Sequence, residues 1–177
     1  MKNIAYIFFL FISLTSCGVK KEKILEHKRI ESLINSLNYK VTLPENWKPI
    51  LNSHNLLSYS PKNLGDIFYK NIVQIHELKA AKVDEDSLNE LVQEKVKQWN
   101  NNVKINSQNL IKGTTKYGET YTYVYEHNWN STHYKNTLIY FRHNDTVYEF
   151  NYSSDIRFYE KYKNDVAFIL NNLKFNE

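Results

Sequence analysis

Six histidines are the side chains in this sequence best suited to bind a metal ion or to move protons near neutral pH. None belongs to a His-Glu-x-x-His motif, and no two form a His-x-His pair. Three of them fall in segments that alternate like strands: His127, His133 and His143. If the segments 118–129 and 132–143 pair across a turn near residues 130–131, His127 and His133 lie nearly opposite one another. A zinc site needs three or four ligands, so these histidines are weak metal candidates, and half-exposed strand residues are the simpler interpretation.

Aromatic residues are the second group with binding potential, and the chain contains 14 tyrosines. In the segment 118–129 they alternate with other residues, so their side chains point to one face of the predicted strand. The candidates on this segment and the next are Tyr121, Tyr123, Tyr125, Trp129, Tyr134 and Tyr140. They can form core packing beneath a helix. They can also form an exposed surface for a peptide, a glycan or a lipid-like ligand, because tyrosine and tryptophan are enriched in binding hot spots.

The only cysteine stands at the end of an apolar leader. Lys2 precedes an almost uninterrupted apolar run over residues 4–14, which is too short to span a bilayer but is typical of a signal peptide. The motif Leu14-Thr15-Ser16-Cys17-Gly18 is similar to a lipobox, which directs acylation of the cysteine and cleavage just before it. We predict a lipoprotein signal peptide over residues 1–16 and a lipid anchor on Cys17. A buried thiol and an uncleaved membrane anchor are the alternatives.

Nucleophilic catalysis finds little support in the sequence. A hydrolase needs an activated nucleophile with a base within reach. The chain has no Gly-x-Ser-x-Gly motif and no glycine-rich phosphate loop among its four glycines. Cys17 is expected to be acylated, so its sulfur is not free to attack a substrate. We therefore predict a protein that is not an enzyme and that uses no cofactor.

Composition restricts the partners and the number of domains. The formal net charge is +4 and the basic residues are scattered, so we expect no binding to nucleic acid. Residues 17–38 are polar at first and then show a weak helical period, which predicts a lipidated tether that ends in a short helix. The alternative for this segment is a basic amphipathic helix that lies on the membrane surface. Residues 39–177 have the size of one globular domain.

Hydrophobic periodicity divides this domain into strands and two helices. Strands are predicted over residues 39–43, 56–60, 71–78, 103–111, 118–129, 132–143 and 146–153, with a turn at 45–47. A first helix begins near Ser87 and ends at residues 100–102, and its apolar face consists of Leu88, Leu91, Val92, Val96 and Trp99. A last helix begins near Asp155, and its predicted buried face consists of Phe158, Tyr162, Val166, Ile169, Leu170 and Leu173. Local strand pairing with two helices predicts an α+β fold, in which helices pack on an antiparallel sheet.

The order of these elements resembles the PsbP/Mog1-like family. Domains of that family open with a short strand and a Leu-Pro-x-x-Trp turn, matched here by Leu43-Pro44-Glu45-Asn46-Trp47. The strand Ser58-Tyr59-Ser60-Pro61, which ends in proline, and the closing apolar segment Leu173-Lys174-Phe175 also match, so the resemblance covers residues 39–175. It implies an α/β/α sandwich around a central antiparallel sheet. Members mostly act as binding, assembly or adaptor modules, and several bacterial members, including the DcrB-like group, are lipoproteins.

One function is preferred from the sequence, and two alternatives stay open. The preferred function is a lipid-anchored cell-envelope protein of a non-enzymatic binding or assembly type, whose partner is an unknown envelope protein or small ligand. The alternatives are a metal-binding or hydrolytic protein that uses the strand histidines, and an immunity or inhibitor lipoprotein. Gly18 and the pair Lys20-Lys21 stand where acidic residues would signal inner-membrane retention or surface export. In a Gram-negative cell we therefore expect attachment to the outer membrane, with the domain facing the periplasm.

Overall fold

The computed structural model describes residues 22–64, 70–78 and 85–176. The predicted signal peptide over residues 1–16 and the anchor residue Cys17 lie outside the described residues. The α-helices of the described part are an N-terminal helix over residues 22–36, α2 (Glu85–Asn102) and α3 (Ile156–Asn171). Not one of these described helices is long and apolar enough to cross a membrane. The strands are β1 (Tyr39–Lys40), β2 (Trp47–Leu51), β3 (Leu57–Pro61), β4 (Asn71–Leu78), β5 (Ile105–Thr115), β6 (Gly118–Trp129), β7 (Thr132–His143), β8 (Thr146–Asp155) and β9 (Lys174–Phe175).

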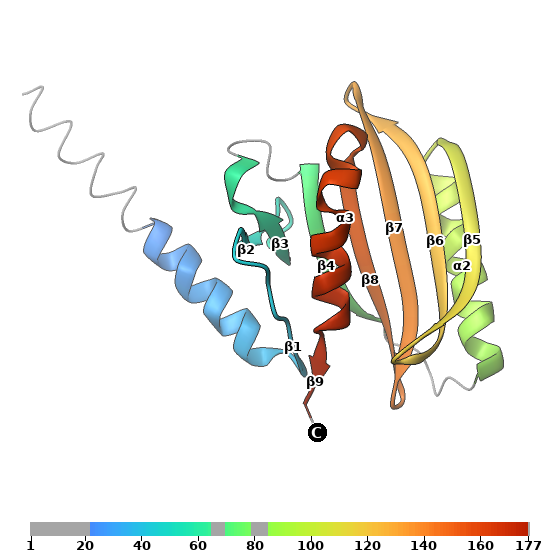
Figure 1. The fold of residues 1–177 in the computed structure, drawn as a ribbon, viewed down its shortest axis with the longest axis horizontal. Coiled ribbons are helices and arrows are strands. Elements are labelled where there is room, and N and C mark those ends of the chain that lie inside the picture. Colours follow the sequence, from blue (N-terminus) through green and yellow to red (C-terminus); the bar gives the residue numbers. More distant parts are fainter. Residues whose placement is uncertain (1–21, 65–69, 79–84, 177) are drawn as a thin grey trace, which may run out of the picture.

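Seven antiparallel strands form one sheet in the order β2-β3-β4-β8-β7-β6-β5 (Figure 1). After β4 the chain continues into α2 and enters the sheet again at the edge strand β5. The consecutive strands β6, β7 and β8 then return across the sheet, until β8 pairs with β4. The bounds of β4, β6 and β7 are those that the sequence predicts. A separate pair is formed by β1 and β9, so the predicted closing apolar segment is a short strand.

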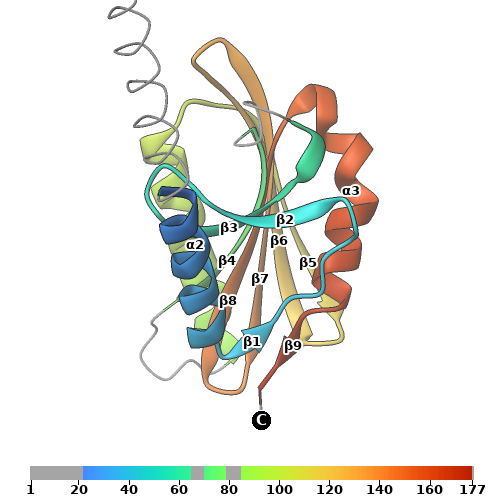
Figure 2. The ribbon, with the colours of Figure 1, turned by 90° about the vertical axis from the view of Figure 1, so that its left-hand side faces the viewer.

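Helices cover both faces of this sheet (Figure 2). Helix α3 lies on one face, while α2 and the N-terminal helix lie on the other. The core on the α3 side includes Val73 of β4, Phe141 of β7 and Phe150 of β8, all fully buried. The core on the α2 side joins Leu88 and Val92 of the helix to residues of β6, β7 and β8. The predicted α+β fold, with an antiparallel sheet between layers of helices, is therefore confirmed.

Helix α3 begins where the sequence predicts because Asp155 caps it. One oxygen of this carboxylate, Oδ1, accepts a hydrogen bond from the backbone N–H of Arg157 at 3.0 Å. The buried stripe of the helix consists of Tyr159, Tyr162, Val166 and Ile169. Tyr159 is absent from the predicted buried face, yet its spacing of three residues from Tyr162 places it on the same side of the helix. Phe158 and Leu170, which the sequence places inward, are half-buried at the edges of the stripe.

The first part of the domain differs most from the prediction. The predicted turn at residues 45–47 ends one residue earlier, since Trp47 begins the edge strand β2. Pro49 obscures this strand in the sequence, but a proline is tolerated at an edge because its missing N–H faces no further strand. Trp47 is 3% exposed, and its Nε1 donates a hydrogen bond to Asp165 Oδ2 of α3 at 2.9 Å. β1 spans only Tyr39–Lys40, and the rest of the predicted strand over 39–43 is an irregular segment.

Candidate functional site

The aromatic ladder of β6 and β7 is mainly core. Leu88 and Val92 of α2 pack on these rings and remove them from solvent. The exposed fractions are 6% for Tyr121, 1% for Tyr123, 3% for Tyr125 and 0% for Tyr140. The interpretation of these four tyrosines as an exposed binding surface is therefore wrong, because α2 covers the part of the sheet from which they project.

The same row of rings continues toward the β6–β7 hairpin, where it becomes exposed to solvent. Tyr125 stacks on His127 at 5.7 Å between ring centroids, and His127 stacks on Tyr134 at 5.4 Å. Burial lowers the pKa of His127 below its ordinary value, which favours the neutral imidazole. Trp129 lies beyond this stack and is 63% exposed. Of the predicted aromatic surface, Trp129 alone is well exposed and Tyr134 is half-buried.

The strand histidines do not converge. Asn130 and Ser131 form a two-residue turn with φ values of 46° and 61°, so His127 lies opposite Tyr134 and His133 lies opposite Asn128. This register differs by one residue from the one that would pair His127 with His133, and a shift of one residue sends a side chain to the other face. His133 instead contacts Glu126, with 3.1 Å between Nε2 and Oε2.

The third histidine lies at the other end of the same strand. His143 ends β7 and stacks on Phe175 of β9, with 4.0 Å between the ring centroids. Within the described ranges, no group of three or more histidine, cysteine, aspartate or glutamate side chains is placed to hold a metal ion. The metal-binding or hydrolytic alternative requires the strand histidines to lie close together, and the described histidines do not, so this part of the prediction is wrong.

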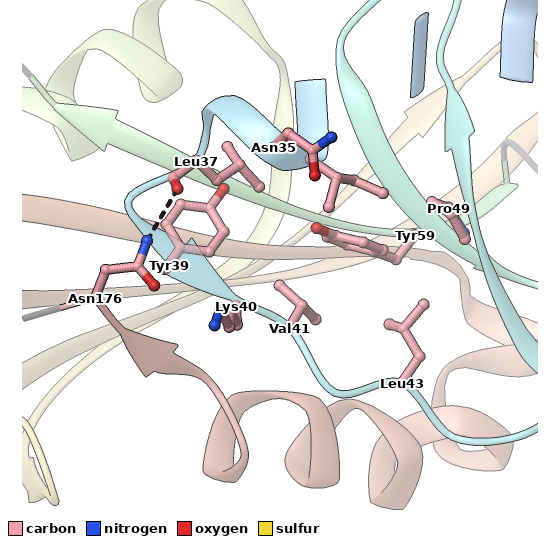
Figure 3. A pocket seen from close by; sticks show the side chains of 10 residues that line it. Asn35, Leu37, Tyr39, Lys40, Val41, Leu43, Pro49, Tyr59 and Asn176 are labelled. Carbon is pink, nitrogen blue, oxygen red and sulfur yellow. Dashed lines mark hydrogen bonds between the residues drawn. The ribbon is translucent and has the colours of Figure 1, made fainter. Parts of the chain in front are cut away.

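A pocket of about 450 Å³ lies where the N-terminal helix meets the β2 side of the sheet, and we call it the helix pocket (Figure 3). Its walls come from the end of the helix, the segment 37–43, strands β2 and β3, and the residue after β9. The lining residues are Ile34, Asn35, Leu37, Tyr39, Lys40, Val41, Leu43, Pro49, Tyr59 and Asn176. Most of them are apolar or aromatic, and the volume is within the range of pockets that hold small ligands.

Hydrogen bonds between the segment after the N-terminal helix and the residue after β9 fix one wall of the helix pocket. The side-chain Nδ2 of Asn176 donates a hydrogen bond to the carbonyl of Leu37 at 3.2 Å (Figure 3). The backbone N–H of Asn176 donates to the carbonyl of Asn38 at 2.8 Å. Asn38 Nδ2 in turn donates to the Tyr148 hydroxyl at 2.7 Å. These bonds hold the segment after the N-terminal helix against the sheet. The helix itself buries Ile30, which is 8% exposed.

The polar groups of the helix pocket are neutral near pH 7, apart from one lysine. Tyr39 donates a hydrogen bond from its hydroxyl to the carbonyl of Ile75 at 3.2 Å, and burial raises its pKa well above the ordinary value. Burial also raises the pKa of Tyr59 to about 12. Of the described lining residues Lys40 is the one with a charged side chain, and none of them is a histidine, a cysteine or a carboxylate. The described lining therefore suits an apolar ligand and offers no general acid or base that titrates near neutral pH.

The sequence did not identify the helix pocket, since its lining residues come from segments far apart in the chain. Only the alternation of Tyr39, Val41 and Leu43 hinted that apolar side chains share one side of this segment. Their apparent role was that of a strand that packs into the core. The structure keeps Tyr39 in the core, while Val41 and Leu43 are half-buried around the pocket.

Comparison with known proteins identifies the fold. No protein-family model and no curated protein sequence matches the chain. LpqN, involved in cell envelope biogenesis of Mycobacterium tuberculosis, matches with a TM-score of 0.56 and 9% identity over 78% of this chain and 83% of LpqN. A protein of Bacteroides thetaiotaomicron VPI-5482 matches with a TM-score of 0.53 and 12% identity, over 79% of this chain but only 46% of that protein.

A further similar structure is cyanobacterial PsbP from Synechocystis sp. PCC 6803. Its TM-score is 0.45 and its identity is 11%, over 78% of this chain and 86% of the cyanobacterial protein. The matches to LpqN and to the Bacteroides protein are consistent with the PsbP/Mog1-like fold that the sequence resembles. At these identities the similarity shows the fold, and it assigns no activity.

Proposed function

We propose that this protein is a lipid-anchored cell-envelope protein that binds an apolar ligand in the helix pocket and catalyses no reaction. The observation that carries the proposal is the chemistry of the pocket lining, which is mainly apolar and has, among its described residues, no group that titrates near neutral pH. The fold it shares with LpqN, a protein involved in cell envelope biogenesis, supports a place in the envelope. The lipobox-like motif at Cys17 supports attachment by a lipid.

The position of the anchor favours a ligand that comes from the membrane. Between Cys17 and residue 22 the chain can extend roughly 18 Å at most. The helix over residues 22–36 adds about 22 Å at 1.5 Å per residue. Ile34 in the last turn of this helix and Leu37 just after it line the pocket. The pocket is therefore held within roughly 40 Å of the acylated cysteine, close enough to take apolar molecules from the envelope.

Ligand binding can be tested with a fluorescent apolar probe, N-phenyl-1-naphthylamine. The protein is prepared without residues 1–16 and with Cys17→Ser, so that no lipid or detergent competes for the probe. We expect saturable binding that weakens at least tenfold in Val41→Phe, because the larger ring occupies the pocket. The matched control is Val124→Phe, a half-buried position of β6 that does not line the pocket. Equal affinity in both variants would contradict the proposal.

The anchor and the membrane need a separate experiment. Mass spectrometry of the protein from its native membrane is expected to show a mature chain that begins at an acylated Cys17. Cys17→Ser should move the protein to the soluble fraction. Density-gradient separation of a Gram-negative envelope should place the wild-type, acylated protein in the outer membrane. An intact leader with a free thiol would rule out lipid anchoring.

A further inference from the structure

A second pocket, of about 250 Å³, lies between α2 and the strands β4 and β8, and we call it the α2 pocket. It shares no lining residue with the helix pocket. Four of its lining residues are Lys95 and Trp99 of α2, His76 of β4 and Glu149 of β8. Lys95, Trp99 and His76 are half-buried, while Glu149 is buried.

Glu149 is the unusual member of this pocket. It is 7% exposed, and the strand register places it directly between His76 and Tyr140. In the described part of the chain, no lysine, arginine or histidine forms an ion pair with Glu149, and the Tyr140 side chain interacts with its carboxylate. A buried carboxylate without a positively charged partner is costly to the folded state, and a cationic ligand would supply that partner.

Tyr140 is the neighbour of Glu149 on β7. This residue is 0% exposed, and its hydroxyl interacts with the Glu149 carboxylate and with Trp99, although neither contact has the geometry of a good hydrogen bond. Burial and then the nearby charge of Glu149 raise the pKa of Tyr140 far above its ordinary value, so the phenol stays protonated. Trp99 lies beside both groups and stacks at an angle on Tyr125, with 5.7 Å between ring centroids.

We propose that the α2 pocket binds a cationic group, an alkylammonium or a guanidinium, with Glu149 as its counter-ion. A carboxylate gives a cation a charge-assisted hydrogen bond, and the ring of Trp99 gives it a favourable aromatic face. Among the described lining residues Lys95 is the one lysine, and its amino group lies beyond ion-pair distance of Glu149. Its charge opposes entry of a second cation, so Lys95 weakens binding. The cation is a free amine or the side chain of a basic peptide.

The test uses the mature lipidated protein in non-ionic detergent and isothermal titration with small probes. n-Butylammonium and ethylguanidinium are expected to bind at least tenfold more tightly than the uncharged n-pentanol. Glu149→Gln, which keeps the shape of the side chain, should weaken both cations at least tenfold. The matched control is Glu90→Gln, an exposed position of α2 outside the pocket. It should leave the affinity unchanged.

Two further measurements make the result independent of folding and identify the source of the cation. Lys95→Met should raise the affinity for n-butylammonium about two- to fivefold, a gain that no folding defect produces. A capped Ala-Lys-Ala peptide that binds more tightly than n-butylammonium points to a basic polypeptide, whereas the reverse order points to a free amine. Equal binding of n-pentanol, or unchanged cation binding in Glu149→Gln, overturns the proposal. Probe binding in the helix pocket should be unaffected by Glu149→Gln, so the two proposals fail separately.

Discussion

Asp155 joins the sheet to helix α3, and we expect its side chain to stabilise this junction. Its Oδ1 accepts hydrogen bonds from the backbone N–H of Arg157 at 3.0 Å and from Arg157 Nε at 2.9 Å, while Oδ2 accepts from the guanidinium at 2.5 Å. The Asp155 side chain is 2% exposed, whereas the Arg157 side chain is 67% exposed. The carboxylate is therefore the buried partner of this ion pair.

The loss in free energy of unfolding that we expect on substitution of Asp155 follows from these contacts. Loss of a helix N-cap costs about 1 kcal/mol, and loss of hydrogen bonds to a charged group costs about 1.5–3 kcal/mol. Asp155→Ala removes both contributions, so we expect a loss of about 3 kcal/mol, which lowers the melting temperature by roughly 6–12 °C for a domain of this size. Asp155→Asn keeps an N-cap acceptor and removes only the charge, so we expect a loss of about 1–2 kcal/mol.

The same contacts make the effect depend on pH. The Arg157 guanidinium and backbone N–H hold the pKa of Asp155 below its ordinary value of 3.8. Because the folded state lowers this pKa, the ionised carboxylate stabilises the protein above about pH 4, and the contribution disappears as the pH falls through the lower, folded-state pKa. Urea unfolding of wild type, Asp155→Asn and Asp155→Ala at pH 7, 4 and 2.5 measures this contribution to the free energy of unfolding. An Asp155→Asn variant as stable as wild type at pH 7, or a constant difference down to pH 2.5, would refute this reasoning.

Three further substitutions test other parts of the structure. Because burial raises the pKa of Tyr59 to about 12, the neutral phenol stabilises the folded state, and wild type should lose stability relative to Tyr59→Phe as the pH rises from 10 towards 12. Urea unfolding of the two proteins between about pH 8 and pH 11 checks this, and a difference in the free energy of unfolding that does not change with pH would contradict it. Ser131 has a φ of 61°, which glycine adopts without strain, so Ser131→Gly should stabilise the hairpin by about 0.5–1 kcal/mol in denaturant unfolding. Tyr140→Phe removes a buried hydroxyl that makes no hydrogen bond of good geometry, so its free energy of unfolding should stay the same or rise by up to about 1 kcal/mol. A loss of more than about 1 kcal/mol would show that the contacts of the hydroxyl with Glu149 and Trp99 stabilise the fold.

The sequence alone determined the features that depend on neighbouring residues. Uninterrupted alternation between turn residues predicted β6 and β7 with their observed bounds. The apolar face of α2 was also evident, because residues three and four apart in a helix share one side, and Leu88 and Val92 are buried there. The lipobox-like motif at Cys17 is equally local, and the lipid anchor that it predicts stays a prediction.

The candidate sites depended on tertiary structure. The pattern of β6 showed that its tyrosines share a face, but only the docking of α2 decided that Tyr121, Tyr123 and Tyr125 are core. The turn at Asn130–Ser131 decided the register, and that register separates His127 from His133. Both pockets join residues far apart in the chain, such as Val41 with Asn176 and Trp99 with Glu149. Periodicity reports which side chains share a face of one element, whereas burial and binding depend on which other element covers that face, and this is set by packing between distant segments.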